Sequence, residues 1–200
     1  AASSAQRGLD SAMEKLSSGS RINYAKDDAA GQAIATRLTA EVQGLAMASR
    51  NASDAQSMID TADSALGETS NLLLRMRELA VQASNGTLSD DDRGALDAEF
   101  DQLALEIDRV DANTSWAGVT LFDDGAERTF HVGTNNTLND KISITIGDMD
   151  ASTLIADVDD NGNGTADATA GVDTVGKAQA TIAALDGAIQ TVSTQRGNLG

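Results

Sequence analysis

A repeat of small and apolar residues, spaced by steps of four and three positions, extends from Leu38 to Ala80. Its members are Leu38, Val42, Leu45, Ser49, Ala52, Gln56, Ile59, Ala62, Leu66, Thr69, Leu73, Met76 and Ala80. This spacing is typical of a coiled-coil seam. The sequence contains no proline, so nothing in it forces a kink in a long helix. The pattern predicts one helix from about Asp28 to Ser84, on the order of 85 Å long, packed beside other helices.

Polar residues mark the ends predicted for this helix. A shorter helical pattern upstream ends at Gly19, because glycine and the serines around it favour turns over helix. Arg21–Tyr24 is then expected to be extended chain. The carboxylates of Asp27 and Asp28 can accept hydrogen bonds from free backbone amides, so they predict the start of the long helix. Gly86, which follows an asparagine, predicts its end.

Two further helices are predicted downstream. Ser89, followed by three aspartates, is a capping signal, and Asp173 and Thr174 form a second one. The apolar positions after the first signal are Leu96, Phe100, Leu103, Ile107 and Val110. Those after the second signal are Val175, Ala178, Ile182, Leu185, Ile189 and Val192. Because both sets repeat the four-three spacing, we expect three antiparallel helices in one bundle.

The region between these two helices has a different pattern. Thr129–Val132 and Ile142–Ile146 alternate apolar and polar residues, which predicts a β-hairpin across a turn region at Gly133–Asp140. Trp116–Phe122 is expected to connect the second helix to this hairpin and to pack against the end of the bundle. Met149–Gly171 has too few apolar residues to form a core of its own.

The low aromatic content supports a helical architecture. One tryptophan, one tyrosine and three phenylalanines leave alanine, leucine, isoleucine, valine and methionine to form the core, which favours closely packed helices. The expected fold class is therefore mainly α: an elongated antiparallel helical bundle with a long N-terminal helix, a shorter second helix, a C-terminal helix and a small β-hairpin.

Composition also argues against several classes of function. The formal net charge of −17 disfavours binding to nucleic acid or to an anionic membrane, and no apolar run is long enough for membrane insertion. The absence of cysteine excludes thiolate metal sites, and the single histidine, His131, excludes histidine clusters. No pattern of catalytic residues is present, so we expect neither an enzyme nor a cofactor or metal.

Asp157–Asp167 partly matches a calcium-binding loop. From Asp159 the order of acids, amides and glycine fits the early positions of such a loop, but Ala170 stands where a bidentate acid is required. A flexible acidic turn is the simpler interpretation. Calcium binding by this stretch stays open.

Four stretches of the chain resemble bacterial flagellin. They are Lys15–Ala35 (KLSSGSRINYAKDDAAGQAIA), Leu72–Gln82 (LLLRMRELAVQ), Leu105–Val110 (LEIDRV) and Thr191–Gly200 (TVSTQRGNLG), in the order found in that family. The resemblance covers nearly all of the chain except about residues 157–170. It implies a structural subunit of the bacterial flagellar filament, which serves motility, lies outside the cell and is secreted without a cleaved signal peptide.

The resemblance also implies a division of the chain. Expected are a terminal helix remnant and extended spoke (1–26), the long and second helices (27–118), a connector with the hairpin (119–148), a short variable loop (149–171) and the C-terminal rod helix (172–200). Both terminal segments that flagellins use to polymerise are expected to be missing, and the outer variable domain to be short or absent. This fragment should therefore be monomeric, although the full-length form would self-associate.

A recognition face is implied as well. In flagellins the matching region lies between protofilaments and is bound by the flagellin-sensing Toll-like receptor. The matching positions in this chain are Arg75, Leu79, Gln82 and Glu106. An arginine offers a planar donor fork, a leucine an apolar anchor, and a carboxylate on the second helix can fix the arginine. The expected partners are other filament subunits, the Toll-like receptor and an export chaperone.

Two alternatives of different kinds stay open. A hook-filament junction protein shares the terminal motifs of flagellin without building the shaft. A flagellin-like cell-surface protein would instead bind a ligand such as a glycan, with Trp116 and Tyr24 as aromatic contacts.

Overall fold

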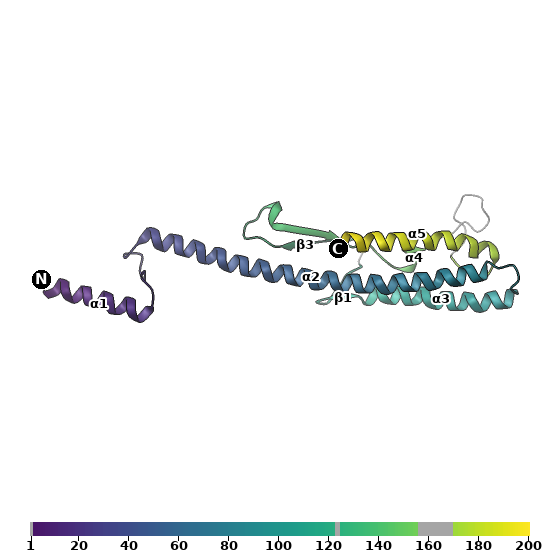
Figure 1. Ribbon diagram of the computed structural model, residues 1–200, viewed down its shortest axis with the longest axis horizontal. Helices are drawn as coiled ribbons and strands as arrows, with labels where there is room; N and C mark the ends of the chain where they lie inside the picture. The colour runs from purple at the N-terminus through teal and green to yellow at the C-terminus, as the bar shows by residue number, and fades with distance from the viewer. Residues whose placement is uncertain (1, 123–124, 156–169) are drawn as a thin grey trace. The chain divides into compact units, whose positions relative to one another are not determined.

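The computed structural model describes residues 2–122, 125–155 and 170–200. Its helices are α1 (Ala2–Ser18), α2 (Ala29–Ala83), α3 (Asp90–Asn113), α4 (Ala151–Leu154) and α5 (Val175–Leu199), with a 3₁₀ helix, η1, at Leu138–Asp140 (Figure 1). The strands are β1 (Ser115–Trp116), β2 (Val119–Thr120), β3 (Glu127–His131) and β4 (Lys141–Thr145). The expected fold class, mainly α-helical with packed helices and a small hairpin, is confirmed.

The contacts of the chain form two compact units. The first comprises Ala1–Ala52 and His131–Lys141, and the second comprises Ser53–Phe130 and Ile142–Gly200. In the first unit, the Asn51 side-chain amide donates a hydrogen bond to the His131 carbonyl oxygen over 2.9 Å. The stretch considered for calcium, Asp157–Asp167, lies outside the described residues.

The later half of α2 carries the seam that the sequence predicts. The buried positions there are Ala62, Leu66, Thr69, Leu73, Met76 and Ala80, in agreement with the four-three spacing. Phe100 and Ile107 of α3 and Leu185 and Val192 of α5 are also buried, and all four belong to the same core. Figure 1 shows α3 and α5 beside this part of α2.

For the earlier half of α2, the predicted seam is not buried, so the prediction is wrong there. Leu38, Val42 and Leu45 are 50%, 65% and 54% exposed, whereas Ala48 and Ala55 are buried. The four-three period indicates a helix, but burial also needs a neighbouring element, and the main core cluster of the described residues begins at Met58. The spacing therefore predicted the helix correctly and its buried face only from Ala62 onward.

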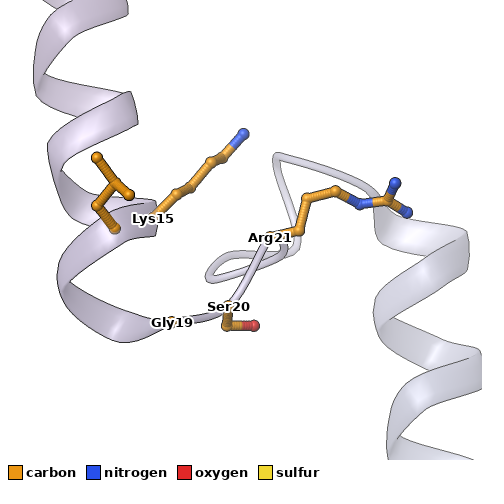
Figure 2. Close-up of a pocket in the computed structure, with 5 residues that line it drawn as sticks. Lys15, Gly19, Ser20 and Arg21 are labelled. Atoms are coloured by element: carbon orange, nitrogen blue, oxygen red, sulfur yellow. The ribbon is translucent and has the colours of Figure 1, made fainter.

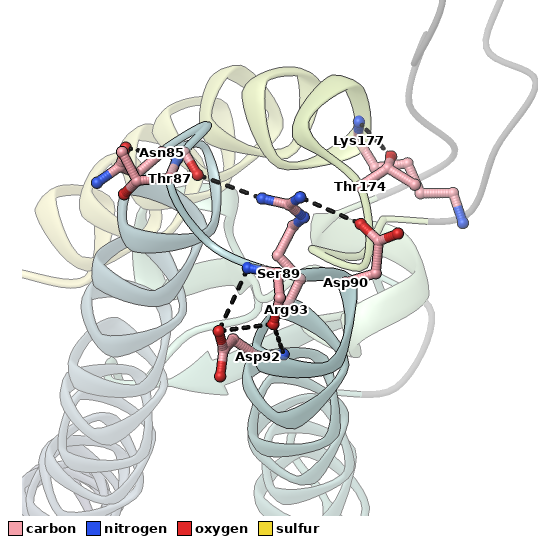
Figure 3. A network of polar contacts seen from close by, with 8 residues as sticks. All are labelled: Asn85, Thr87, Ser89, Asp90, Asp92, Arg93, Thr174 and Lys177. Atoms are coloured by element: carbon pink, nitrogen blue, oxygen red, sulfur yellow. Dashed lines mark hydrogen bonds and ion pairs between the residues drawn. The ribbon is translucent and has the colours of Figure 1, made fainter.

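Local capping fixes the turn between α2 and α3 (Figure 3). Ser89 Oγ accepts from the Asp92 amide over 3.2 Å, which confirms the predicted Ser89 cap. Asp92 Oδ2 accepts in return from the Ser89 amide over 3.2 Å, which completes a capping box. Arg93 is 8% exposed and donates to the Asn85 carbonyl oxygen and to Asp90, both at 3.2 Å. At the start of α5, Thr174 Oγ1 accepts from the Lys177 amide over 3.2 Å, as its capping pattern predicts.

The β elements are short. β3 and β4 form the predicted hairpin, and the Thr129 and Ser143 hydroxyls lie 2.9 Å apart across it. β1 and β2 form a second hairpin that was not predicted, closed by Ala117 and Gly118 with φ values of 51° and 81°. Two consecutive positive φ angles are characteristic of the tight type I′ turn. The connector continues into buried Leu121 and Phe122, which confirms the expected packing of this segment.

Helix α4 was also not predicted. It has four residues, Ala151–Leu154, within a segment expected to be a loop. The Asp150 side chain caps it by accepting from the Thr153 amide. Ala151, Leu154 and Ile155 are buried, so this short apolar cluster joins the bundle core instead of forming one of its own.

Candidate interaction face on α2 and α3

Arg75 is the centre of an exposed ion-pair network. Its guanidinium donates from Nε and Nη2 to Glu99 Oε1 of α3 over 3.0 and 2.7 Å, and from Nη1 to Glu78 Oε2 over 2.9 Å. The Glu99 contact, followed by that of Glu78, raises the pKa of Arg75 above its ordinary value. Because Arg75 is 49% and Glu99 45% exposed in their side chains, the network is open to solvent and to a partner.

Glu106 lies apart from Arg75. Arg109, one turn further along α3, donates to Glu106 from Nε over 2.7 Å and also from Nη2. This hydrogen bonding lowers the pKa of Glu106. Glu99 and Glu106 are separated by about 10 Å along the helix. The carboxylate that fixes Arg75 across the helix pair is therefore Glu99, which sequence reasoning missed.

Leu79 and Gln82 have different environments. Leu79 is 1% exposed and belongs to the bundle core, so its side chain does not reach the surface of this chain. Gln82 is exposed. Of the four residues expected at the face, Arg75 and Gln82 are exposed, Glu106 is partly exposed and Leu79 supports the face from below.

Two exposed apolar residues on α2 were also missed. Leu74 is 48% and Val81 47% exposed. They are seven positions apart, which places them on one side of the helix. The sequence could have indicated them, because both are apolar residues that lie outside the four-three spacing of the buried seam. We call Leu74, Arg75, Glu78, Val81 and Gln82 the α2 face.

The neighbouring arginine belongs to a different contact. Arg77 donates from Nε to Asp186 Oδ1 of α5 over 2.7 Å, and this contact raises the pKa of Arg77. Arg75 thus links α2 to α3, and Arg77 links α2 to α5. The α2 face combines apolar side chains with a guanidinium that carboxylates of α2 and α3 hold in place, which suits binding to another protein surface.

The described residues include surface hollows but no metal-binding cluster. They contain no group of three or more histidine, cysteine, aspartate or glutamate side chains able to hold a metal ion. A hollow of about 330 Å³ lies at the end of α1, lined by Lys15, Leu16, Gly19, Ser20 and Arg21. In Figure 2 the charged ends of the Lys15 and Arg21 side chains do not meet over this hollow, so they do not form a convergent anion site.

Within residues 2–122, 125–155 and 170–200, no helix combines the length and the apolar character needed to cross a bilayer.

Comparison with known proteins places these features in a family context. The family described as the bacterial flagellin N-terminal helical region matches residues 1–127. The chain is 46% identical over 166 residues to phase 1 flagellin of Salmonella naestved and, to the same extent, to flagellin of Salmonella dublin. Each alignment covers 83% of this chain and 32% of the relative. The chain therefore spans about a third of the length of these relatives.

Solved structures show the same similarity. Bacillus cereus flagellin is 32% identical with a TM-score of 0.57, covering 76% of this chain and 81% of that one. FliC from Burkholderia pseudomallei is 19% identical with a TM-score of 0.61, covering 73% and 97%. A putative flagellar hook-associated protein from Vibrio parahaemolyticus is 18% identical with a TM-score of 0.53, covering 88% and 91%. The last two show likeness of fold alone.

Proposed function

The chain belongs to the bacterial flagellin family, and from this premise we propose that it is the helical part of a structural subunit of the flagellar filament. The full-length protein would polymerise outside the cell into the filament that serves motility, after export without a cleaved signal. The 46% identity to Salmonella flagellins over 166 residues carries this proposal. Assembly would rest on packing between subunits, with no chemical reaction involved.

Exposed apolar residues in the first unit support the assembly proposal. Ile34, Leu38, Val42 and Leu45 are each about half or more exposed and recur at helical spacing. Such a stripe exceeds the scattered single apolar residues that a monomer surface usually carries. It provides an apolar surface that contacts in the full-length assembly could bury.

Immunogold electron microscopy of the source cells tests the proposal. An antibody raised against this chain should label the whole length of the filament. Label confined to the base or tip would instead indicate a junction protein. The likeness to the hook-associated protein does not decide between these two roles, because it shows the fold alone. Label on the cell body would indicate a surface-binding protein.

The α2 face supports a second, finer proposal: binding to the flagellin-sensing Toll-like receptor. Arg75 would be the anchor, since Glu78 and Glu99 hold its guanidinium in place before a partner arrives. Leu74, Val81 and Gln82 would add contact area beside it. Leu79 would act indirectly by packing below the face, and Glu106 would contact the partner separately from Arg75.

Arg75→Ala tests this proposal. We expect it to weaken binding to the purified receptor ectodomain by about 1–3 kcal/mol, as for an arginine hot spot. Arg77→Ala is the matched control, because Arg77 is on the same helix and its side chain is 42% exposed, against 49% for Arg75, but it pairs toward α5. Equal effects of the two changes, or unchanged affinity for Arg75→Ala with unchanged helicity, would refute the assignment. Leu79→Ala is unsuitable because it would open a cavity in the core.

A further inference from the structure

The turn between α2 and α3 contains an asparagine followed by a glycine, Asn85 and Gly86, and both residues are exposed (Figure 3). This pair predicted the end of α2, and it lies outside the α2 face. Asparagine is among the thermally labile residues of proteins. Its side-chain amide is lost when the next backbone nitrogen attacks the side-chain carbonyl carbon, Cγ. The geometry around Gly86 therefore decides whether the folded chain permits this reaction.

The Asn85 side chain is held over the residues that follow it. Its Oδ1 accepts a hydrogen bond from the Thr87 amide over 3.2 Å, which is an Asx-turn. The ring that this hydrogen bond closes includes both Asn85 Cγ and the Gly86 nitrogen. The two atoms that must react are therefore kept on the same short loop of chain, which lowers the entropy cost of bringing them together.

The Gly86 amide is available for the attack. The Asn85 amide donates to the Gln82 carbonyl oxygen over 3.2 Å, and the Leu88 amide donates to the Asn85 carbonyl oxygen over 3.3 Å. Within the described part of the chain, no hydrogen bond uses the Gly86 amide. A Cβ built on Gly86 would meet no atom within 4 Å, so neighbouring atoms do not shield its nitrogen. Glycine also leaves the backbone free to rotate into the attack.

The hydrogen bond from the Thr87 amide also favours the reaction itself. Attack on Asn85 Cγ moves negative charge onto Oδ1. A donor that already lies at this oxygen stabilises the charge in the transition state without rearrangement. The hydrogen bond that shapes the turn therefore also lowers the barrier to the attack.

The chemistry needs only water. The Gly86 nitrogen forms a bond to Asn85 Cγ and loses its proton, the Cγ–Nδ2 bond breaks, and Nδ2 leaves with that proton as ammonia. The product is a cyclic imide, a succinimide. Water then breaks one of the two bonds that join the Gly86 nitrogen to a carbonyl carbon. Cleavage at Cγ gives aspartate, and cleavage at the backbone carbonyl carbon gives isoaspartate.

Arg93 lies at the backbone carbonyl of Asn85 (Figure 3). Its Nη1 donates to that oxygen over 3.2 Å, and its buried Nε has no hydrogen-bond partner. In isoaspartate the same oxygen belongs to the new carboxylate. A neutral acceptor of the Arg93 hydrogen bond thus becomes a charged one, and the contact becomes stronger. The turn therefore favours isoaspartate over aspartate.

We propose that Asn85 is a spontaneous deamidation site of the folded chain, and that Arg93 binds the isoaspartate carboxylate formed there. The proposal concerns the isolated chain and does not depend on a role in a filament.

Timed incubation of the full chain in mildly alkaline buffer tests the site, with the folded chain compared with the chain unfolded in urea. Tryptic cleavage after Arg77 and Arg93 releases Asn85 on a peptide that contains no other asparagine, for mass spectrometry. Folding should change the Asn85 rate by no more than about threefold, because the reaction needs no opening of the structure. Asn71 is also exposed on α2 but is followed by an amide inside the helix, so folding should slow its reaction at least about tenfold.

Gly86→Ala is the matched variant. The φ angle of Gly86 is outside the left-handed region and a Cβ there has open space, so alanine should leave the fold intact. Its side chain crowds the attacking nitrogen and restricts the backbone, so deamidation at Asn85 should slow about fivefold or more. In the unchanged chain, the ratio of isoaspartate to aspartate should be about twofold higher when folded than when unfolded, because only the fold brings Arg93 to this oxygen.

Two results would overturn the site. One is that folding slows the reaction of Asn85 as strongly as that of Asn71, and the other is that Gly86→Ala leaves the Asn85 rate unchanged. An isoaspartate-to-aspartate ratio that does not rise on folding would overturn the role of Arg93. If Gly86→Ala perturbs folding, the comparison of the folded and unfolded forms of the unchanged chain still decides the question.

Discussion

At the scale of single residues, Asp63 of α2 and Arg196 of α5 form a two-point contact. Arg196 donates from Nε to Asp63 Oδ1 over 2.7 Å and from Nη2 to Asp63 Oδ2 over 3.3 Å. This hydrogen bonding lowers the pKa of Asp63 below its ordinary value near 3.8. Both side chains are more than two-fifths exposed, so solvent screens the pair and its contribution to stability is modest.

The lowered pKa sets the direction of a pH effect. The pair stabilises the fold fully above the ordinary pKa of aspartate and loses this contribution as the pH falls through the lower pKa of the folded state. Arg196→Gln should therefore reduce the urea midpoint slightly at neutral pH and have less effect in acid. A double-mutant cycle with Asp63→Asn, repeated across pH, measures this coupling. Coupling that stays constant down to about pH 2 would contradict the assignment.

The residues expected at the recognition face show what a sequence can predict about a surface. Arg75 and Gln82 were expected at the face and are exposed there. The pairing of Arg75 with Glu99 could not be predicted, because the relative register of α2 and α3 decides which glutamate meets it, and two candidates lie two turns apart. Leu79 is buried because two helices together cover this part of α2. The four-three stripe of apolar residues on α2 alone does not specify that coverage.

At the scale of elements, local sequence signals predicted where helices begin better than they predicted which residues are in contact. The capping box at Ser89 and the Thr174 cap place the starts of α3 and α5, because these interactions involve residues three apart in sequence. The β1–β2 hairpin and α4 escaped prediction because two-residue strands and a four-residue helix are too short to show a period. The seam was predicted from Leu38 to Ala80, but it is buried only where covering helices lie beside it.

The two halves of α2 should respond differently to loss of a leucine. Leu66 is fully buried, so Leu66→Ala should lower the free energy of unfolding by about 2.5–5 kcal/mol through lost burial and a residual cavity. Leu38 is half exposed, and Leu38→Ala should change the free energy of unfolding by about 0.5 kcal/mol or less. Urea unfolding of both variants gives the comparison. A Leu38 effect as large as that of Leu66 would mean that the early seam is covered in solution.

At the scale of the whole molecule, the buried core and the exposed apolar stripe belong to different units. The core cluster lies in the second unit, from Met58 onward, whereas Ile34, Leu38, Val42 and Leu45 lie in the first. Helices gain most of their stability from packing of an apolar face, so a continuous helix can differ in stability along its length. The early part of α2 should therefore open more readily than the later part.

Hydrogen exchange of the isolated chain can measure this difference. Amides of residues 34–45 should exchange much faster than those of residues 62–80, since opening the former exposes little buried apolar surface. If the full-length protein forms the filament proposed above, assembly should slow amide exchange at residues 34–45 and change exchange at residues 62–80 little. Leu38→Ala, which should hardly change the stability of the isolated chain, should then weaken assembly. Equal protection of both stretches in the isolated chain would refute the uneven stability. Unchanged exchange at 34–45 after assembly would instead show that the stripe is not a subunit contact.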